Sequence, residues 1–262
     1  MNILDEIAAR TRLRVGEEKK KVPLQQIRRE AESMGTDGEF PFYRALAGGD
    51  ISFICEVKKA SPSKGIIAED FPYLQIAQEY EKAGAAAVSC LTEPYWFLGK
   101  DEYLKEIASN VRIPVLRKDF TVDEYMIYQA KSSGAFAILL ICAILEDGQL
   151  KAYGQLAREL GLSVLTEAHT EREIERALRA GADIIGVNNR NLKNFEVDVT
   201  QSRRMRSMVP EGVLYVSESG IKTPEDVAVL RENKTDAVLI GETLMRAADK
   251  KEMLNRLRGE MK

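Results

Sequence analysis

The sequence predicts an α/β protein, a (β/α)8 TIM barrel with an N-terminal helical extension, on three observations. From Ile51 onward, short apolar runs alternate with polar, helix-periodic segments at intervals of about 26 residues, which suits one strand, one helix and two short loops. Many of these runs are apolar on both faces, as strands of a helix-covered parallel sheet are. The runs number eight, which favours a closed barrel over an open sheet.

The first 48 residues are predicted to be a helical extension, followed by the barrel at 49–262, and we expect the two to form one domain. Residues 3–16 fit an amphipathic helix. Its expected apolar stripe consists of Ile3, Leu4, Ile7, Ala8 and Leu13. A second helix is expected at 24–34, after Pro23. The sequence leaves open whether this extension only caps the barrel or covers the site.

The eight apolar runs define where the strands should end. They end at Val57, Leu91, Lys118, Cys142, Glu167, Asn188, Glu218 and Gly241. A helix–Gly–Ala–strand pattern recurs at 82–88, 132–138 and 179–185, with the glycine suited to end each helix. No G-x-G-x-x-G follows the first run, which weakens the alternative of a dinucleotide-binding fold.

Composition excludes several classes of function. The formal net charge of −3 argues against a nucleic-acid partner or an anionic membrane surface, and no apolar run approaches the roughly 20 residues that span a bilayer. The start of the chain has no secretory signal pattern, so we expect a cytoplasmic protein. The three cysteines lie in apolar runs and read as core residues in a reducing compartment. A single histidine, His169, excludes multi-histidine metal sites.

Catalytic groups of such barrels lie at the carboxyl ends of the strands. Glu56 and Lys58 project to the same side because strand side chains alternate between faces. The other polar strand ends are Lys118, Glu167, Asn188, Glu218 and Ser219. Lys118 shares its face with Leu116 and Phe120, so we expect desolvation to lower its pKa and suit it to proton transfer. Arg117 and Asp119, on the opposite face, are expected to form a structural ion pair.

Two further features extend the predicted site. Gly220 and Gly241 stand at the ends of the last two strands, where barrels often bind phosphate through backbone N–H groups. Ser61, on the loop after the first strand, would close the other side of this phosphate site. His169 follows Glu167 by two residues, and the sequence leaves open whether it is catalytic or only begins a helix.

Together these residues resemble the indole-3-glycerol phosphate synthase family, over the whole chain. The segments that carry the resemblance are Glu56–Ser63, Leu91–Gly99, Leu116–Phe120, Leu165–His169, Gly186–Leu192 and Val216–Ile221. The resemblance implies that an anilino-deoxyribulose phosphate with an ortho carboxylate closes to an indole, losing carbon dioxide and then water. It implies general acid–base catalysis and no metal or redox cofactor. The implied partner is a phosphorylated small molecule.

The resemblance also implies roles for individual residues. Lys118 would be the acid of ring closure and Glu167 with Lys58 the dehydration pair, although the division between the two lysines stays open. Glu56 and Asn188 would orient the lysines and the sugar hydroxyls, with Ser219 and Glu218 assisting. Arg190 would bind the substrate carboxylate. The residues expected to enclose the aromatic ring are Phe97, Phe120 and Leu139.

The implied phosphate contacts include one departure from many relatives. They are Ser61, Gly220, Gly241 and the backbone N–H of Glu242, where many relatives have a small hydroxyl residue. Because a carboxylate would repel phosphate, we expect the Glu242 side chain to turn away and Thr243 to cap the following helix.

The sequence leaves two alternatives open. One is a neighbouring phosphosugar barrel such as phosphoribosylanthranilate isomerase, whose Cys–Asp acid–base pair fits poorly because Cys55 and Glu56 face opposite sides. The other is a non-catalytic phosphate-binding barrel, which would explain the glycines but not the inward lysines. We expect a monomer, with a homodimer as the alternative.

Overall fold

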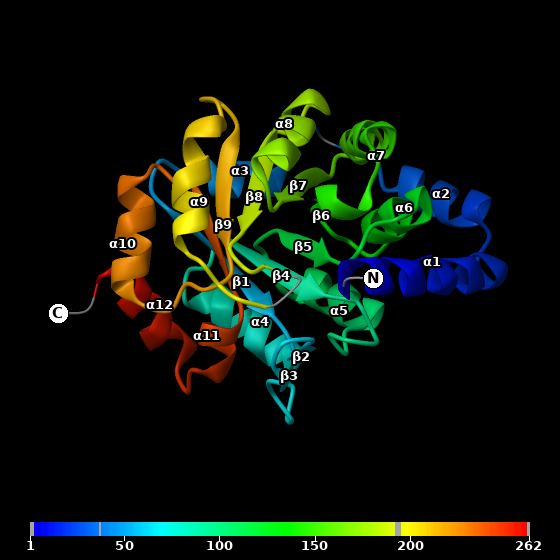
Figure 1. Ribbon diagram of the computed structural model, residues 1–262. Helices are drawn as coiled ribbons and strands as arrows, with labels where there is room; N and C mark the ends of the chain where they lie inside the picture. The colour runs from blue at the N-terminus through cyan, green and yellow to red at the C-terminus, as the bar shows by residue number, and fades with distance from the viewer. Residues whose placement is uncertain (1–2, 37, 192–194, 261–262) are drawn as a thin grey trace.

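Eight parallel strands close into a barrel in the computed structural model, which describes residues 3–36, 38–191 and 195–260 (Figure 1). The strand order around the barrel is β1-β10-β9-β8-β7-β6-β5-β4. Their bounds are Ser52–Val57 (β1), Ala87–Leu91 (β4), Val115–Lys118 (β5), Ala137–Ile141 (β6), Ser163–Ala168 (β7), Ile184–Asn188 (β8), Leu214–Glu218 (β9) and Ala237–Ile240 (β10). The predicted (β/α)8 barrel is therefore confirmed, with strand ends within one residue of those expected.

Helices separate the strands and cover the outside of the barrel (Figure 1). They are Tyr73–Lys82 (α4), Asp101–Asn110 (α5), Glu124–Ser132 (α6), Asp147–Glu159 (α7), Glu171–Arg179 (α8), Thr200–Met205 (α9), Pro224–Glu232 (α10), Glu242–Arg246 (α11) and Lys250–Arg258 (α12), with short 3-10 turns at Cys142–Ile144 (η1) and Arg206–Met208 (η2). A small hairpin of Ala60–Ser61 (β2) and Gly65–Ile66 (β3) follows β1. Cys142, expected to end a strand, lies in η1 because β6 ends one residue earlier.

Local sequence explains where several helices begin. Thr223 accepts the N–H of Asp226 and Asp226 accepts the N–H of Thr223, so a capping box starts α10, with Pro224 in its first turn. Asp123 accepts the N–H of Tyr125 at the start of α6. These caps satisfy backbone donors that the first helical turn leaves without partners.

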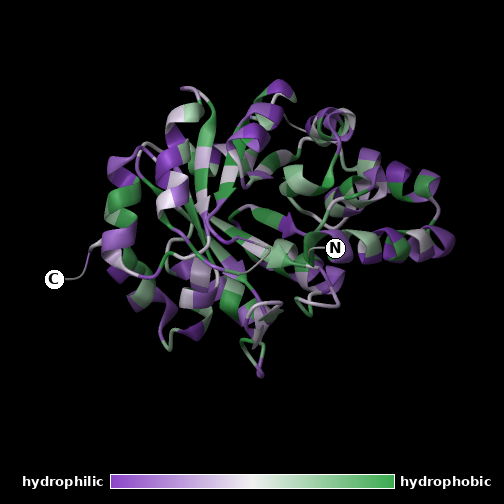
Figure 2. Cartoon of the chain, viewed as in Figure 1, coloured by the Kyte–Doolittle hydropathy of each residue, from purple (hydrophilic) through white to green (hydrophobic). Residues whose placement is uncertain are grey.

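The strands divide the core into two parts. Side chains such as Ile54, Leu116 and Leu165 fill the inside of the barrel, whereas Cys55 and Val164 face the helices. Green apolar residues recur along the strands in Figure 2, while the helices alternate purple and green. This pattern explains why the strand runs are apolar on both faces. None of the described helices is long and apolar enough to cross a membrane.

Three helices precede the barrel: Ile3–Lys21 (α1), Leu24–Ser33 (α2) and Pro41–Leu46 (α3). α2 packs beside α6, with α1 running past the same side of the barrel (Figure 1). Phe42 and Leu46 of α3 are fully buried in the inner core, and α3 contacts β1 and β7.

The predicted apolar stripe of the first helix is wrong at Leu13. Leu4, Ile7 and Ala8 are buried as expected, but Leu13 is 65% exposed and Val15 is buried instead. Leu13 follows Leu4 by nine residues, about 2.5 turns at 3.6 residues per turn, so the two side chains point in opposite directions. The helix also extends to Lys21, five residues beyond the predicted end.

Candidate active site

A cavity of about 600 Å³ opens at the carboxyl ends of the strands. Its wall contains every residue that the sequence proposed for the site: Glu56, Lys58, Ser61, Phe97, Lys118, Phe120, Leu139, Glu167, Asn188, Arg190, Glu218, Ser219, Gly220, Gly241 and Glu242. Ile3, Leu4 and Ile7 of α1 also line it. The N-terminal extension therefore forms part of the cavity wall. Leu192, at the end of one family-like segment, lies outside the described residues.

Glu56 and Lys58 form an ion pair at the end of β1, with 2.5 Å between Lys58 Nζ and Glu56 Oε2. Gly241, at the end of β10, makes room for this pair. A Cβ added at Gly241 would lie 2.4 Å from Glu56 Oε2 and 2.7 Å from Lys58 Nζ. The sequence assigned Gly241 to phosphate alone, but in space it also lies against the Glu56–Lys58 ion pair.

Lys118 projects from β5 between two carboxylates. Its Nζ lies 3.4 Å from Glu218 Oε2 and 3.6 Å from Glu167 Oε2. Burial disfavours the charged ammonium, but Glu218, Glu167 and Glu56 together outweigh burial, so the pKa of Lys118 is raised. The sequence expectation of a lowered pKa is wrong, because those carboxylates come from three other strands and neighbour Lys118 only in the closed barrel.

Glu218 has the most perturbed carboxyl group of the site. Burial is the main cause, with repulsion from Glu167 and Glu56 adding to it, and together they raise the pKa of Glu218 to about 8 despite attraction by Lys118. The pKa values of both partners are therefore raised, that of Lys118 by the neighbouring carboxylates and that of Glu218 by burial and by the other two carboxylates. Gly186 of β8 makes space here, because a Cβ would lie 2.2 Å from Glu218 Oε1.

Asn188 and Ser219 shape the next part of the wall. Asn188 donates from Nδ2 to Glu167 Oε1 at 3.4 Å and accepts the N–H of Arg190 at 3.0 Å. Ser219 (φ +71°) and Gly220 (φ +86°) both occupy the left-handed region, which is uncommon for serine. A strained serine at a strand end is a feature of functional sites.

The apolar wall is held by a residue that the sequence reasoning missed. The rings of Phe97 and Phe120 lie 6.2 Å apart between centroids. Glu93, fully buried, accepts the backbone N–H groups of Tyr95, Trp96 and Phe97 at 2.8–3.1 Å. Glu93 lies within the family-like segment Leu91–Gly99, but only the folded loop shows that its carboxylate holds Phe97 in place.

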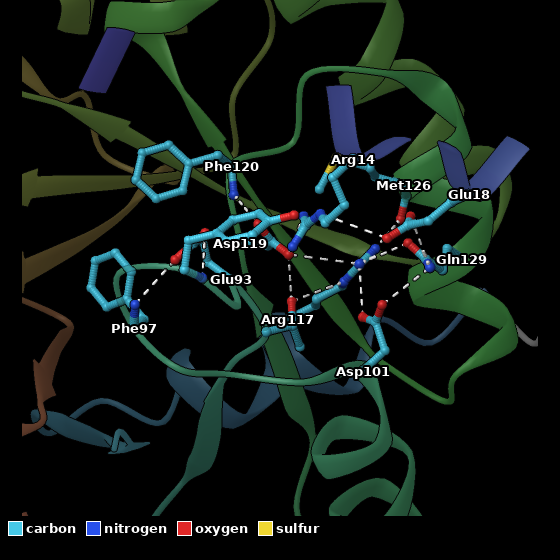
Figure 3. Close-up of polar contacts among 12 residues, drawn as sticks. Arg14, Glu18, Glu93, Phe97, Asp101, Arg117, Asp119, Phe120, Met126 and Gln129 are labelled. Atoms are coloured by element: carbon cyan, nitrogen blue, oxygen red, sulfur yellow. Dashed lines mark hydrogen bonds and ion pairs between the residues drawn. The ribbon is translucent and has the colours of Figure 1, made fainter. Parts of the chain in front are cut away.

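The predicted pair of Arg117 and Asp119 is confirmed at 3.7 Å and belongs to a larger buried network (Figure 3). Arg117 donates to Asp101 at 2.8 Å and to Gln129 at 2.7 Å. Asp119 accepts from Arg14 of α1 at 2.8 Å and from the N–H of Phe120 at 2.8 Å. Two members of this network, Arg117 and Asp119, stand directly before and after Lys118 in the chain.

One expectation at the phosphate end is wrong, and the expectation for Glu242 stays a prediction. The Glu242 carboxylate lies 3.1 Å from Arg246 and 3.6 Å from Lys64, two other residues of the cavity wall. Burial opposes its ionisation, but these cations and Lys58 outweigh burial and lower the pKa of Glu242. Thr243 does not cap α11, because its hydroxyl donates to the Ile221 carbonyl at 2.8 Å. The sequence reasoning missed Lys222 and Arg246, since surface cations resemble solvated charges.

The three cysteines do not line the cavity. Cys55 is fully buried on the helix-facing side, and burial raises the pKa of its thiol to about 12. Cys90 and Cys142 are likewise buried and unpaired. Within the described ranges, no three His, Cys, Asp or Glu side chains gather as a metal ion requires.

Solved structures similar to the chain share its fold. A thiamine phosphate pyrophosphorylase from Pyrococcus furiosus matches with a TM-score of 0.62 at 15% identity, covering 82% of this chain and 96% of that one. A chain of the tryptophan synthase complex from Pyrococcus furiosus matches with a TM-score of 0.58 at 14% identity. The match covers 80% of this chain and 98% of that one. At these identities the likeness shows the barrel alone.

Sequence relatives and a family model show the family of the chain in addition to its fold. The family model described as indole-3-glycerol phosphate synthase matches residues 4–257. The indole-3-glycerol phosphate synthase of Ruminiclostridium cellulolyticum is 54% identical over 257 residues, covering 98% of this chain and 99% of the relative. The indole-3-glycerol phosphate synthase of Endomicrobium trichonymphae is 53% identical over 256 residues, covering 98% of this chain and 99% of the relative. The chain belongs to the indole-3-glycerol phosphate synthase family.

Proposed function

We propose that Lys118, Lys58 and the carboxylates around them carry out the reaction of this family, a carboxy-lyase step of tryptophan biosynthesis. The substrate is 1-(2-carboxyphenylamino)-1-deoxyribulose 5-phosphate and the products are indole-3-glycerol phosphate, carbon dioxide and water. One observation supports this assignment above the others: the Lys118 ammonium lies between Glu167 and Glu218 in a cavity whose neighbouring wall is aromatic.

The parts of the cavity match the parts of this substrate. Phe97, Phe120 and Leu139 would contact the aromatic ring, and Arg190 would bind the substrate carboxylate through two of its guanidinium N–H groups. Ser61 and the backbone N–H groups at Gly220, Gly241 and Glu242 would bind the phosphate. Lys64 and Arg246 hold the Glu242 carboxylate, which reduces the repulsion that it would exert on a phosphate.

Ring closure requires an acid at the ketone oxygen. As the aromatic carbon that bears the carboxylate attacks the ketone carbon, the carbonyl π electrons move to oxygen and take a proton from Lys118. The raised pKa of Lys118, caused by the carboxylates that outweigh its burial, keeps this proton available. The carbon–carboxylate bond then breaks, and its electrons return to the ring system as carbon dioxide leaves.

Dehydration requires a second acid for the departing hydroxyl and a base for the ring proton. Glu167 and Lys58 are the proposed pair, with Glu56 and Asn188 orienting them. Glu218 is a further proton carrier, because burial raises its pKa to about 8 and it holds a proton at neutral pH. Ser219, beside it in strained backbone, would bind a sugar hydroxyl.

The test is an indole-fluorescence assay on the anilino-deoxyribulose phosphate. We expect product with the wild type and with Lys105→Met, a change at an exposed lysine of α5. Lys118→Met should form no product while still binding the substrate, measured by quenching of protein fluorescence. Near-normal turnover in Lys118→Met would remove Lys118 from the mechanism. A folded wild type that forms no indole would favour the alternative of another phosphosugar barrel such as phosphoribosylanthranilate isomerase.

We also propose a cytoplasmic, monomeric enzyme. The location rests on three thiols that are buried and unpaired, as expected in a reducing compartment. Light scattering of the purified protein tests the monomer, and a mass of twice 29.4 kDa would contradict it.

A further inference from the structure

His169, the only histidine of the chain, lies between two carboxylates. It directly follows β7, and its side chain is 14% exposed. Nε2 lies 3.4 Å from Glu167 Oε1, and Nδ1 lies 3.6 Å from Glu173 Oε2. Glu167 faces the cavity and Glu173 belongs to the first turn of α8, so the imidazole connects the cavity wall with a covering helix.

Helix capping explains only part of this arrangement. Thr170 accepts the N–H of Glu173 at 3.2 Å, and Glu173 accepts the backbone N–H of His169 at 2.6 Å. These contacts begin α8 but need no imidazole. Both ring nitrogens are buried and, among the described residues, neither makes a hydrogen bond of normal geometry. Buried polar atoms of this kind call for an explanation in structure or function.

We propose that His169 is a positioning residue that holds the Glu167 carboxylate for catalysis, and that Glu173 holds the imidazole in its charged form. The proposal rests on the role of Glu167 in the proposed function. In this proposal the His169 imidazolium is a second cation beside Glu167. It lies at Oε1 of the carboxylate, whereas Lys118 lies at Oε2.

The charges around the imidazole favour its protonated form. The groups that face the imidazole are Glu167 from β7, Glu173 from α8 and Glu218 from β9, while Arg176 of α8 faces Glu173. Burial disfavours the imidazolium, but the carboxylates outweigh burial and raise the pKa of His169. His169 contacts Glu167 and does not contact Glu218. The imidazolium therefore distinguishes the two carboxylates around Lys118, and we assign the proton to Glu218 and the base to Glu167.

Because the chain has one histidine, its imidazole carbon-bound proton signals can be followed by NMR without ambiguity. We expect the titration midpoint of His169 in the wild type to lie above its ordinary value of 6.5. Glu167→Gln and Glu173→Gln should each lower the midpoint by about one pH unit, because each removes an adjacent negative charge. Glu171→Gln, an exposed carboxylate in the first turn of α8, is the matched control and should leave it unchanged. A midpoint that Glu167→Gln does not move would overturn the proposal.

Kinetics supply the second test. His169→Gln keeps a polar side chain but cannot carry the charge. We expect kcat to fall about tenfold, equivalent to one pKa unit of lost interaction, with KM changed less than about twofold. The wild-type loss of kcat as His169 deprotonates should be absent in this variant. Equal kcat and an unchanged pH profile would contradict the positioning role.

The outcomes separate this inference from the proposed function. If Glu167→Gln keeps normal turnover, the role of Glu167 fails and the inference fails with it. If Glu167→Gln is inactive but leaves the His169 titration unchanged, only the inference fails. The carboxylate variants leave the histidine in place, so the titration decides the question even if His169→Gln does not fold.

Discussion

Arg14 of α1 and Asp119, the residue after Lys118, form a buried ion pair of 2.8 Å although 105 residues separate them (Figure 3). The same Asp119 accepts the hydroxyl of Thr92 at 2.6 Å and the N–H of Phe120 at 2.8 Å. Burial opposes the ionised carboxyl, but Arg14 and Arg117 outweigh burial and lower the pKa of Asp119. The N-terminal extension is thus attached to the backbone that orients Lys118 and Phe120.

Removal of Arg14 should therefore affect both stability and catalysis. Arg14→Met leaves the buried Asp119 charge with one cation fewer, and we expect a loss of about 3 kcal/mol in the free energy of unfolding. Displacement of Lys118 and Phe120 should lower kcat/KM about tenfold or more. Urea unfolding and the indole assay measure the two effects.

The matched control is Lys19→Met. Lys19 also pairs α1 with the barrel, at 2.7 Å from Asp123, but this pair is about one-third exposed and does not contact Asp119. We expect a loss of about 1 kcal/mol or less and unchanged kcat/KM. If Arg14→Met keeps normal kcat/KM, the pair serves stability alone.

Glu93 should act on substrate binding through Phe97. In Glu93→Gln the side-chain amide N–H groups would face backbone N–H donors that the carboxylate now accepts. We expect a loss of about 2 kcal/mol in stability and a higher KM, with a smaller change in kcat. Glu102→Gln, an exposed change on α5, is the control. An unchanged KM would show that the loop keeps Phe97 in place without Glu93.

Ser61→Ala and Gly241→Ala should give different kinetic signatures. Ser61→Ala removes one hydroxyl from the proposed phosphate site, so KM should rise with kcat nearly unchanged. Gly241→Ala places a Cβ against Glu56 and Lys58, so kcat should fall as well. Initial rates over a range of substrate concentrations separate the two. A normal kcat in Gly241→Ala would mean that Glu56 and Lys58 can move aside without loss of activity.

Glu218 should make stability and activity depend on pH. Burial raises its pKa from 4.5 to about 8, so between these values the folded state keeps a proton that the unfolded state has released. Stability contributed by Glu218 is therefore fully present below pH 4.5 and lost as pH rises towards about 8. Urea unfolding across this window should show a flatter pH dependence for Glu218→Gln. If Glu218 donates its proton, kcat of the wild type should also fall as pH rises through about 8.

The structure confirms two placements made from the sequence, the ends of the strands and the location of the proposed site residues at one mouth, for the same reason. The alternation of apolar runs and helical segments placed all eight strand ends within one residue, and each site residue proposed from those ends lines the cavity. In a closed parallel barrel all strand ends meet at one mouth, so position along the chain determines the location of Glu56, Lys118 or Glu218. The prediction that Leu13 is buried was wrong because each residue of a helix is rotated by about 100° from the one before it. Leu13 therefore lies on the opposite side of the helix from Leu4, although both are apolar.

By itself, the sequence determined the barrel, its family and the set of side chains at the mouth, because these follow from periodicity and from short motifs. Only the tertiary structure decided which groups touch. It raised the pKa of Lys118 through carboxylates of other strands, brought Gly241 against Glu56 and Lys58, and joined Arg14 to Asp119. Charge interactions and steric contacts act through space over a few ångströms, and distances of that kind between residues far apart in the chain exist only after folding.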